Sequence, residues 1–222
     1  MINNQLVNIS LIIFCFLSFL LIYNQNIDII ISSLFYSKNV GFIYKDNFFV
    51  KKLYYSIPIL TKILVVTCLC SIAYLYLKTK NLKIILSSGF FFLLITASLG
   101  PGLIVNFILK ENMGRARPRE IIEFDGSKLY TGAGIISDQC QSNCSFSSGH
   151  AAMGFYFTAI SYIFRRKFTK IFLSSMLFGM LVGLSRIIMG GHFTSDVVIS
   201  GFIVLIINHL IYVLWENYRL KI

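Results

Sequence analysis

The segment Ser185–Asp196 places a cation, an imidazole and a carboxylate between two long apolar runs, as Arg186, His192 and Asp196. Such groups are costly in lipid, so their presence there usually marks a functional site. His192 and Asp196 are four residues apart, which predicts that they share one helix face and that the carboxylate holds the imidazole Nδ1 proton. Nε2 is then free as a base or nucleophile, and Arg186 supplies donors for an anionic group.

A second cluster, Lys110 to Arg119, is rich in cations. Pro118 disfavours a helical conformation at Arg117, so we expect a helix to end near that residue. The long side chains of Lys110 and Arg117 could then converge on one phosphate. A basic edge that snorkels to the membrane surface explains this cluster as well when it is taken alone.

The third cluster is Ser148-Gly149-His150, directly before an apolar run. Small residues at a helix start leave backbone N–H groups free to bind anions, and the Ser148 hydroxyl can also cap the helix. Gly149 allows close backbone approach, and His150 is placed to protonate a departing oxygen. A plain N-cap followed by an unrelated histidine explains this cluster equally well by itself.

The elements that position these clusters follow from composition. The 222 residues are 56% hydrophobic and only 13% charged, with mean hydropathy +0.75. This balance predicts one all-α domain over residues 1–222, an integral membrane helical bundle. The formal net charge of +11 does not indicate nucleic acid, because the chain has no basic helix with interleaved aromatic residues. It fits cations that anchor the helices, or a basic pocket for an anionic lipid.

Apolar segments predict about six transmembrane helices, of which the fourth is short. The short basic segments at 78–83 and 165–170, and the basic C-terminal end, predict a cytoplasmic location for these parts. Both termini are then cytoplasmic, and all three clusters lie at the outer face. The predicted spans are 7–23, 57–77, 84–109, 150–164, 171–189 and 197–215.

Two other segments face the same outer side. Residues 28–37 predict an amphipathic helix in the membrane interface, or an ordinary aromatic belt. Cys140 and Cys144 lie in a polar loop, where an oxidising compartment would allow a disulfide. A zinc site would need further ligands at matching spacing, so we expect no metal site.

Together the clusters resemble the type-2 phosphatidic acid phosphatase superfamily. The resemblance lies in order and spacing: Lys110 with Arg117-Pro118, then Ser148-Gly149-His150, then Ser185-Arg186 with His192 and Asp196. Ser147 departs from the pattern, because the superfamily usually has proline there.

The resemblance implies a phosphatase that needs no metal or other cofactor. His192 would attack phosphorus with Asp196 orienting it, and His150 would protonate the leaving oxygen and then activate water. The other matched residues would hold phosphate oxygens, namely Lys110, Arg117, Ser148, Gly149 and Arg186.

Within the superfamily the chain resembles the bacterial lipid A 4′-phosphatases. This implies a multi-pass protein of the bacterial inner membrane that removes a lipid phosphate at the periplasmic face. Undecaprenyl diphosphate, phosphatidylglycerophosphate and phosphatidic acid are alternative substrates. A transporter would place polar residues at the bilayer midplane, and a haloperoxidase-like oxidant would not need six spans. Loop cations such as Arg115 and Arg119 are either substrate-selecting groups or solvated charges, and nothing in the sequence indicates an oligomeric state.

Overall fold

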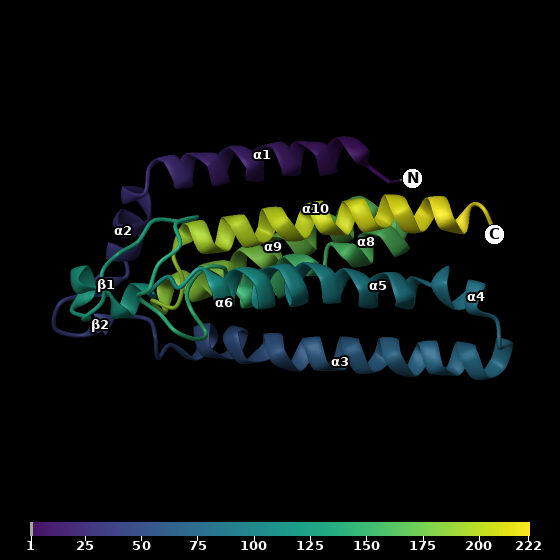
Figure 1. Cartoon of the computed structure of the whole chain (residues 1–222), viewed down its shortest axis with the longest axis horizontal. Coiled ribbons are helices and arrows are strands. Elements are labelled where there is room, and N and C mark those ends of the chain that lie inside the picture. The colour runs from purple at the N-terminus through teal and green to yellow at the C-terminus, as the bar shows by residue number, and fades with distance from the viewer. Residues whose placement is uncertain (1) are drawn as a thin grey trace.

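The computed structural model describes residues 2–222 and confirms the predicted all-α class, as an elongated bundle of helices (Figure 1). Within these residues, five helical segments are long and apolar enough to cross a membrane. The start of the first and the end of the last lie at the same end of the bundle, opposite the loops (Figure 1). The five segments are Asn4–Tyr23, Phe48–Thr79, Gly89–Asn112, Arg165–Ile188 and Thr194–Arg219.

The N-terminal part of the chain forms one long helix, followed by a short helix and a hairpin at the end of the bundle where the long loops lie. Helix α1 (Asn4–Tyr23) is followed by α2 (Asn26–Ser33) and by an antiparallel hairpin of β1 (Tyr36–Ser37) and β2 (Gly41–Phe42). The helix predicted over 28–37 therefore ends four residues earlier, at Ser33, where the chain turns into the hairpin.

The next pass runs out along α3 (Phe48–Thr79) and returns through α4 (Leu82–Leu86) and α5 (Gly89–Ala97). The return continues as the π-helix η1 (Ser98–Leu109) and the single turn α6 (Lys110–Asn112). Pro101 lies inside η1 and lacks a backbone N–H, and the Asn106 side chain donates to the Pro101 carbonyl at 2.7 Å.

The prediction that this helix ends near Arg117 is wrong by several residues. The helix stops at Asn112, and Gly114 then adopts a positive φ of +59° that reverses the chain. Arg117 is extended, as expected before proline. Beyond it, η2 (Pro118–Glu120) and η3 (Ile122–Phe124) begin a long loop that reaches Ser148.

The predicted fourth span, 150–164, is not among the five long apolar segments, because this region forms two short helices, α7 (Gly149–Tyr156) and α8 (Ala159–Ile163). Almost all of α7 is buried among its neighbours. Asn208 of α10 donates to the Tyr156 carbonyl and to the Thr158 hydroxyl, at 3.3 and 3.0 Å, where the helix breaks. Irregular backbone at membrane depth is tolerated when protein surrounds it and satisfies its polar groups.

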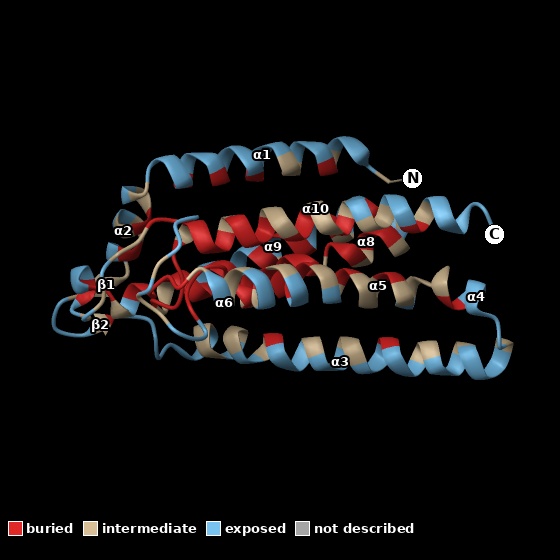
Figure 2. Cartoon of the chain, in the orientation of Figure 1, coloured by how far each residue is buried: buried red, intermediate tan, exposed pale blue. Residues whose placement is uncertain are grey.

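The bundle closes with η4 (Arg165–Lys167), α9 (Phe168–Ile188) and α10 (Thr194–Arg219). The buried core runs along α7, α9 and α10, whereas α1 and α3 expose most of their apolar side chains (Figure 2). Apolar side chains on the outside are expected where lipid replaces water as the surrounding medium. The arrangement therefore positions the ends of α6, α7, α9 and α10 together beneath the loops.

Candidate active site

All three predicted clusters lie at the loop end of the bundle. His150 is within Coulombic range of Lys110, Arg117, Arg186 and His192, so the three separate sequence clusters converge. One detail of the prediction is wrong, because His192 precedes α10, which begins at Thr194, and does not share a helix face with Asp196.

The His192 ring is fixed by the backbone rather than by Asp196. Its Nδ1 lies 2.7 Å from the Ser145 carbonyl oxygen, whereas the nearest Asp196 oxygen is 3.6 Å away, too far for a hydrogen bond. A carbonyl can only accept, so Nδ1 carries the proton and Nε2 keeps its lone pair. Burial lowers the pKa of His192 to about 3, aided by the Arg186 charge and opposed by Asp196. The imidazole is therefore neutral at physiological pH.

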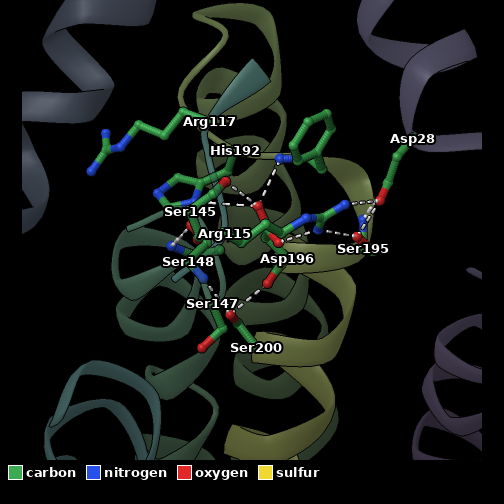
Figure 3. A network of polar contacts seen from close by, with 12 residues as sticks. Asp28, Arg115, Arg117, Ser145, Ser147, Ser148, His192, Ser195, Asp196 and Ser200 are labelled. Carbon is green, nitrogen blue, oxygen red and sulfur yellow. Dashed lines mark hydrogen bonds and ion pairs between the residues drawn. The ribbon is translucent and has the colours of Figure 1, made fainter. Parts of the chain in front are cut away.

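Asp196 instead belongs to a buried ion network centred on Arg115 (Figure 3). Arg115 donates to Asp196 at 2.6 Å and to Asp28 at 2.8 Å, and all three side chains are at most 1% exposed. Ser145 Oγ donates to the second Asp196 oxygen at 2.6 Å, and the Phe193 N–H donates to it at 2.9 Å. The carboxylate is thus fully engaged, and it is linked to His192 through Ser145.

Asp28 joins α2 to the start of α10. It accepts from the Ser195 N–H at 2.9 Å and also from the Ser195 hydroxyl. Burial raises the pKa of Asp28, and the Arg115 charge acts against that rise. The Arg115 guanidinium also lies over the Phe193 ring, 4.2 Å from its centroid.

Sequence reasoning missed two members of this network, Arg115 and Asp28. Arg115 was expected to be a substrate-selecting group or a solvated charge, and it is instead among the most buried side chains described. Asp28 was considered only as part of an interfacial helix. The signal for Asp28 was present, since an aspartate within the apolar run Ile27–Ile31 needs a partner to be tolerated.

The opposite side of the site holds donors that have no protein partner. His150 Nε2 and Arg186 Nε are buried, and neither has a hydrogen-bond partner within residues 2–222. Tyr54 of α3 contacts both residues: its ring stacks on His150 at 4.4 Å between centroids, and the Arg186 guanidinium lies 4.4 Å above it. Gly191 leaves the space that the Arg186 guanidinium occupies, because a Cβ there would collide with it.

Two further cations complete this side. Arg117 is 7% exposed, and one of its guanidinium nitrogens donates to the Asn143 carbonyl at 2.6 Å, which fixes the side chain. Lys110 lies at the start of α6, within Coulombic range of Arg117 and Arg186. Three converging cations with donors to spare suit an anion such as phosphate.

Ser148 and Gly149 begin α7 as predicted, although Ser148 offers less than expected. Its Oγ caps the helix by accepting from the Ala151 N–H at 3.4 Å. Its own N–H, which was expected to be bare, donates to Ser200 Oγ at 2.8 Å. Gly149 packs so closely on the Asn106 side chain that a Cβ would not fit. The first-turn N–H groups of Gly149 and His150 have no helical acceptor and are the ones available to an anion.

Cys140 and Cys144 form a disulfide in the loop that carries Asn143 and Ser145. The Asn143 carbonyl that holds Arg117 lies inside the segment that the bridge closes, and the Ser145 carbonyl that holds His192 follows it directly. Among the residues that the structure describes, no group of three or more His, Cys, Asp or Glu side chains could hold a metal ion.

Comparison with known proteins identifies relatives over most of the bundle. Residues 88–220 match the PAP2 superfamily. The chain is 39% identical over 141 residues to a lipid A 4′-phosphatase of Francisella tularensis subsp. novicida, covering 63% of each chain. It is 35% identical to lipid A 4′-phosphatases of Rhizobium leguminosarum and Rhizobium etli, covering 46% and 40% of those proteins. The chain thus spans less than two thirds of each relative, and no solved structure matches it.

Proposed function

The chain belongs to the PAP2 superfamily, and we propose that it hydrolyses a phosphate monoester on a membrane lipid, with His192 as the nucleophile. The observation that carries the proposal is the contact of His192 Nδ1 with the Ser145 carbonyl at 2.7 Å, which orients the ring beside the converging cations. Such a ring presents Nε2 as a nucleophile without any proton loss.

In the proposed reaction, His192 Nε2 attacks phosphorus while the bond from phosphorus to the lipid oxygen breaks. The bound phosphate dianion offsets the charges of Lys110, Arg117 and Arg186 around His150, so His150 takes up a proton as the lipid binds. His150 then gives this proton to the lipid oxygen, and the lipid leaves as an alcohol. Water then attacks the phosphohistidine, His150 takes a proton from the water, and inorganic phosphate leaves as the P–N bond breaks. Lys110, Arg117 and Arg186 stabilise the charge on the phosphoryl oxygens, together with the first-turn N–H groups of Gly149 and His150.

We propose lipid A as the substrate and its 4′-phosphate as the group removed, because three curated relatives are named lipid A 4′-phosphatase. The basic segments at 78–83 and 165–170 support cytoplasmic termini and a periplasmic site, and the bacterial relatives support an inner-membrane location. The start of α1 and the end of α10 lie at the end of the bundle opposite the β1–β2 hairpin, which agrees with termini on one side of the membrane (Figure 1).

The test is phosphate release by purified protein in detergent, with a chelator present, from lipid A, undecaprenyl diphosphate and phosphatidylglycerophosphate. We expect release from lipid A, and fragmentation mass spectrometry of the product should locate the loss at the 4′ position. Phosphate release from undecaprenyl diphosphate alone would contradict lipid A as the substrate. Full activity of His192→Ala, or inactivation by the chelator, would overturn the mechanism.

A further inference from the structure

A second basic cavity lies beside the candidate active site, between the β1–β2 hairpin and the turn after α9. It has a volume of about 550 Å³, and its cationic lining consists of Lys38, Lys45, Lys51 and Arg119. We call this cavity the hairpin pocket. None of these four residues belongs to the catalytic set described above, so the function proposed for the site does not explain them.

The hairpin pocket carries excess positive charge. Two carboxylates also line it, so its four cations and two carboxylates leave a net charge of +2. Asp46 pairs with Lys51 at 2.7 Å, and Asp125 accepts a hydrogen bond from the Tyr36 hydroxyl at 2.5 Å. Lys38, Lys45 and Arg119 make no ion pair within the described part of the chain, and all three are exposed. Their charges are therefore available to an external anion.

The hairpin pocket and the active site share one wall. Met189 lines the pocket, and its sulfur lies 3.4 Å from a guanidinium nitrogen of Arg186. The Arg119 N–H donates to the Gly190 carbonyl at 3.1 Å. Gly190 has a φ of +63° and lies directly against the Phe42 ring, where a Cβ would not fit. An anion in the pocket would thus be separated from the catalytic residues by a single turn.

We propose that the hairpin pocket binds a second anionic group, a phosphate or a carboxylate, on the same lipid headgroup that loses its phosphate at His192. This proposal rests on the proposed lipid phosphatase function. A single exposed cation attracts an anion only weakly, so the pocket would need several cations acting together. Because the pocket does not contact the reacting phosphate, these cations would increase the affinity for the lipid rather than the rate of the chemical step. The pocket would then select headgroups that carry two anionic groups over those that carry one.

The test measures the hydrolysis of two lipids by two variants of the protein, each with three substitutions. The probes are lipid A with both phosphates and the monophosphorylated form that keeps only the 4′-phosphate. The test variant replaces Lys38, Lys45 and Arg119 by Gln, which leaves the Arg119 backbone contact intact. The matched control replaces Arg166, Lys167 and Lys170 by Gln, three exposed cations of η4 and the start of α9, which follow α8 at the end of the bundle opposite the hairpin (Figure 1).

We expect the test variant to raise KM for the two-phosphate lipid about tenfold, with kcat and the one-phosphate KM within about twofold of wild type. The control variant should change neither KM. An unchanged ratio of the two KM values in the test variant would overturn the proposal while leaving the lipid phosphatase function intact. If only inhibition by inorganic phosphate weakened, the pocket would bind free phosphate and the headgroup assignment would be wrong.

Direct binding separates this proposal from the proposed function. In the His192→Ala background, which should not turn over, the affinities for the two lipids are measured by competition in detergent micelles. A preference for the two-phosphate lipid that disappears in the test variant supports the pocket even if wild type releases no phosphate. Equal affinities for the two lipids in the otherwise unaltered pocket would overturn it.

Discussion

The two sides of His192 differ in how completely their polar atoms are paired. On the Asp196 side, Arg115, Asp28 and Ser145 satisfy one another through short hydrogen bonds. On the other side, His150 Nε2 and Arg186 Nε are buried with no partner among residues 2–222. The paired side is a scaffold whose loss should reduce stability. The unpaired side is organised for an anion, and its loss should reduce activity.

The substitution with the largest expected effect is at His192, which lies between the two sides. His192→Ala removes the group that the scaffold holds and the cations surround, so phosphate release should fall at least about 10⁴-fold. His209→Gln is the matched control, since within residues 2–222 its ring has one hydrogen-bond partner, Tyr162 at 3.3 Å, and it lies far along α10 from the site. Residual activity within tenfold of wild type would exclude His192 as the nucleophile.

On the paired side, Arg115→Met should destabilise the protein by about 3–5 kcal/mol, because two buried carboxylates lose their shared countercharge. The midpoint of thermal unfolding in detergent should fall by about 10 °C. Arg119→Met, from the same loop but exposed, should leave the midpoint nearly unchanged. An equally small change for Arg115→Met would show that the network is not structural.

On the unpaired side, Arg186→Met and His150→Gln should each reduce kcat/KM by about 10²–10³, the usual loss when a group that stabilises the transition state is removed. The unfolding midpoint should stay the same or rise for Arg186→Met, which removes a buried polar atom that lacks a partner, and should stay nearly the same for His150→Gln, which keeps a polar side chain. A large fall in the midpoint for either variant would contradict the distinction between the two sides.

Tyr54 tests how the unpaired side is held in place. Tyr54→Leu removes the ring that contacts His150 and Arg186, and we expect a loss of about threefold to tenfold in kcat/KM. Tyr54→Phe keeps the ring and should retain activity within about twofold. Tyr55→Leu, an exposed neighbour, is the control. Equal losses in Tyr54→Phe and Tyr54→Leu would assign the effect to the hydroxyl instead.

The smallest expected effect comes from the loop with the Cys140–Cys144 disulfide, which contacts residues on both sides of the site. Replacing Cys140 and Cys144 by Ser releases a loop whose carbonyls hold Arg117 and His192, and we expect KM to rise by about twofold to threefold. Cys70→Ser, an exposed free cysteine, is the control. Free labelling of both thiols without reductant would show that the bridge does not form in the membrane.

Much of the unpaired side could be predicted from the sequence. Lys110, Arg117, His150 and Arg186 lie in short segments whose residue types and spacing are informative by themselves. The paired side could not be predicted in the same way, because Arg115 meets Asp28 across 87 positions and Asp196 across 81. The expected helical pairing of His192 with Asp196 failed for a local reason, since the Gly190–Gly191 turn keeps His192 outside α10.

By itself, the sequence determined that the chain is a membrane helical bundle and which residue types could perform phosphoryl transfer, because hydropathy and local spacing depend only on neighbouring residues. Only the tertiary structure decided which charges are neutralised inside the protein and which remain available to a substrate. The physical reason is desolvation: burial makes every charge costly, so its role depends on whether the fold brings it a partner from a distant segment.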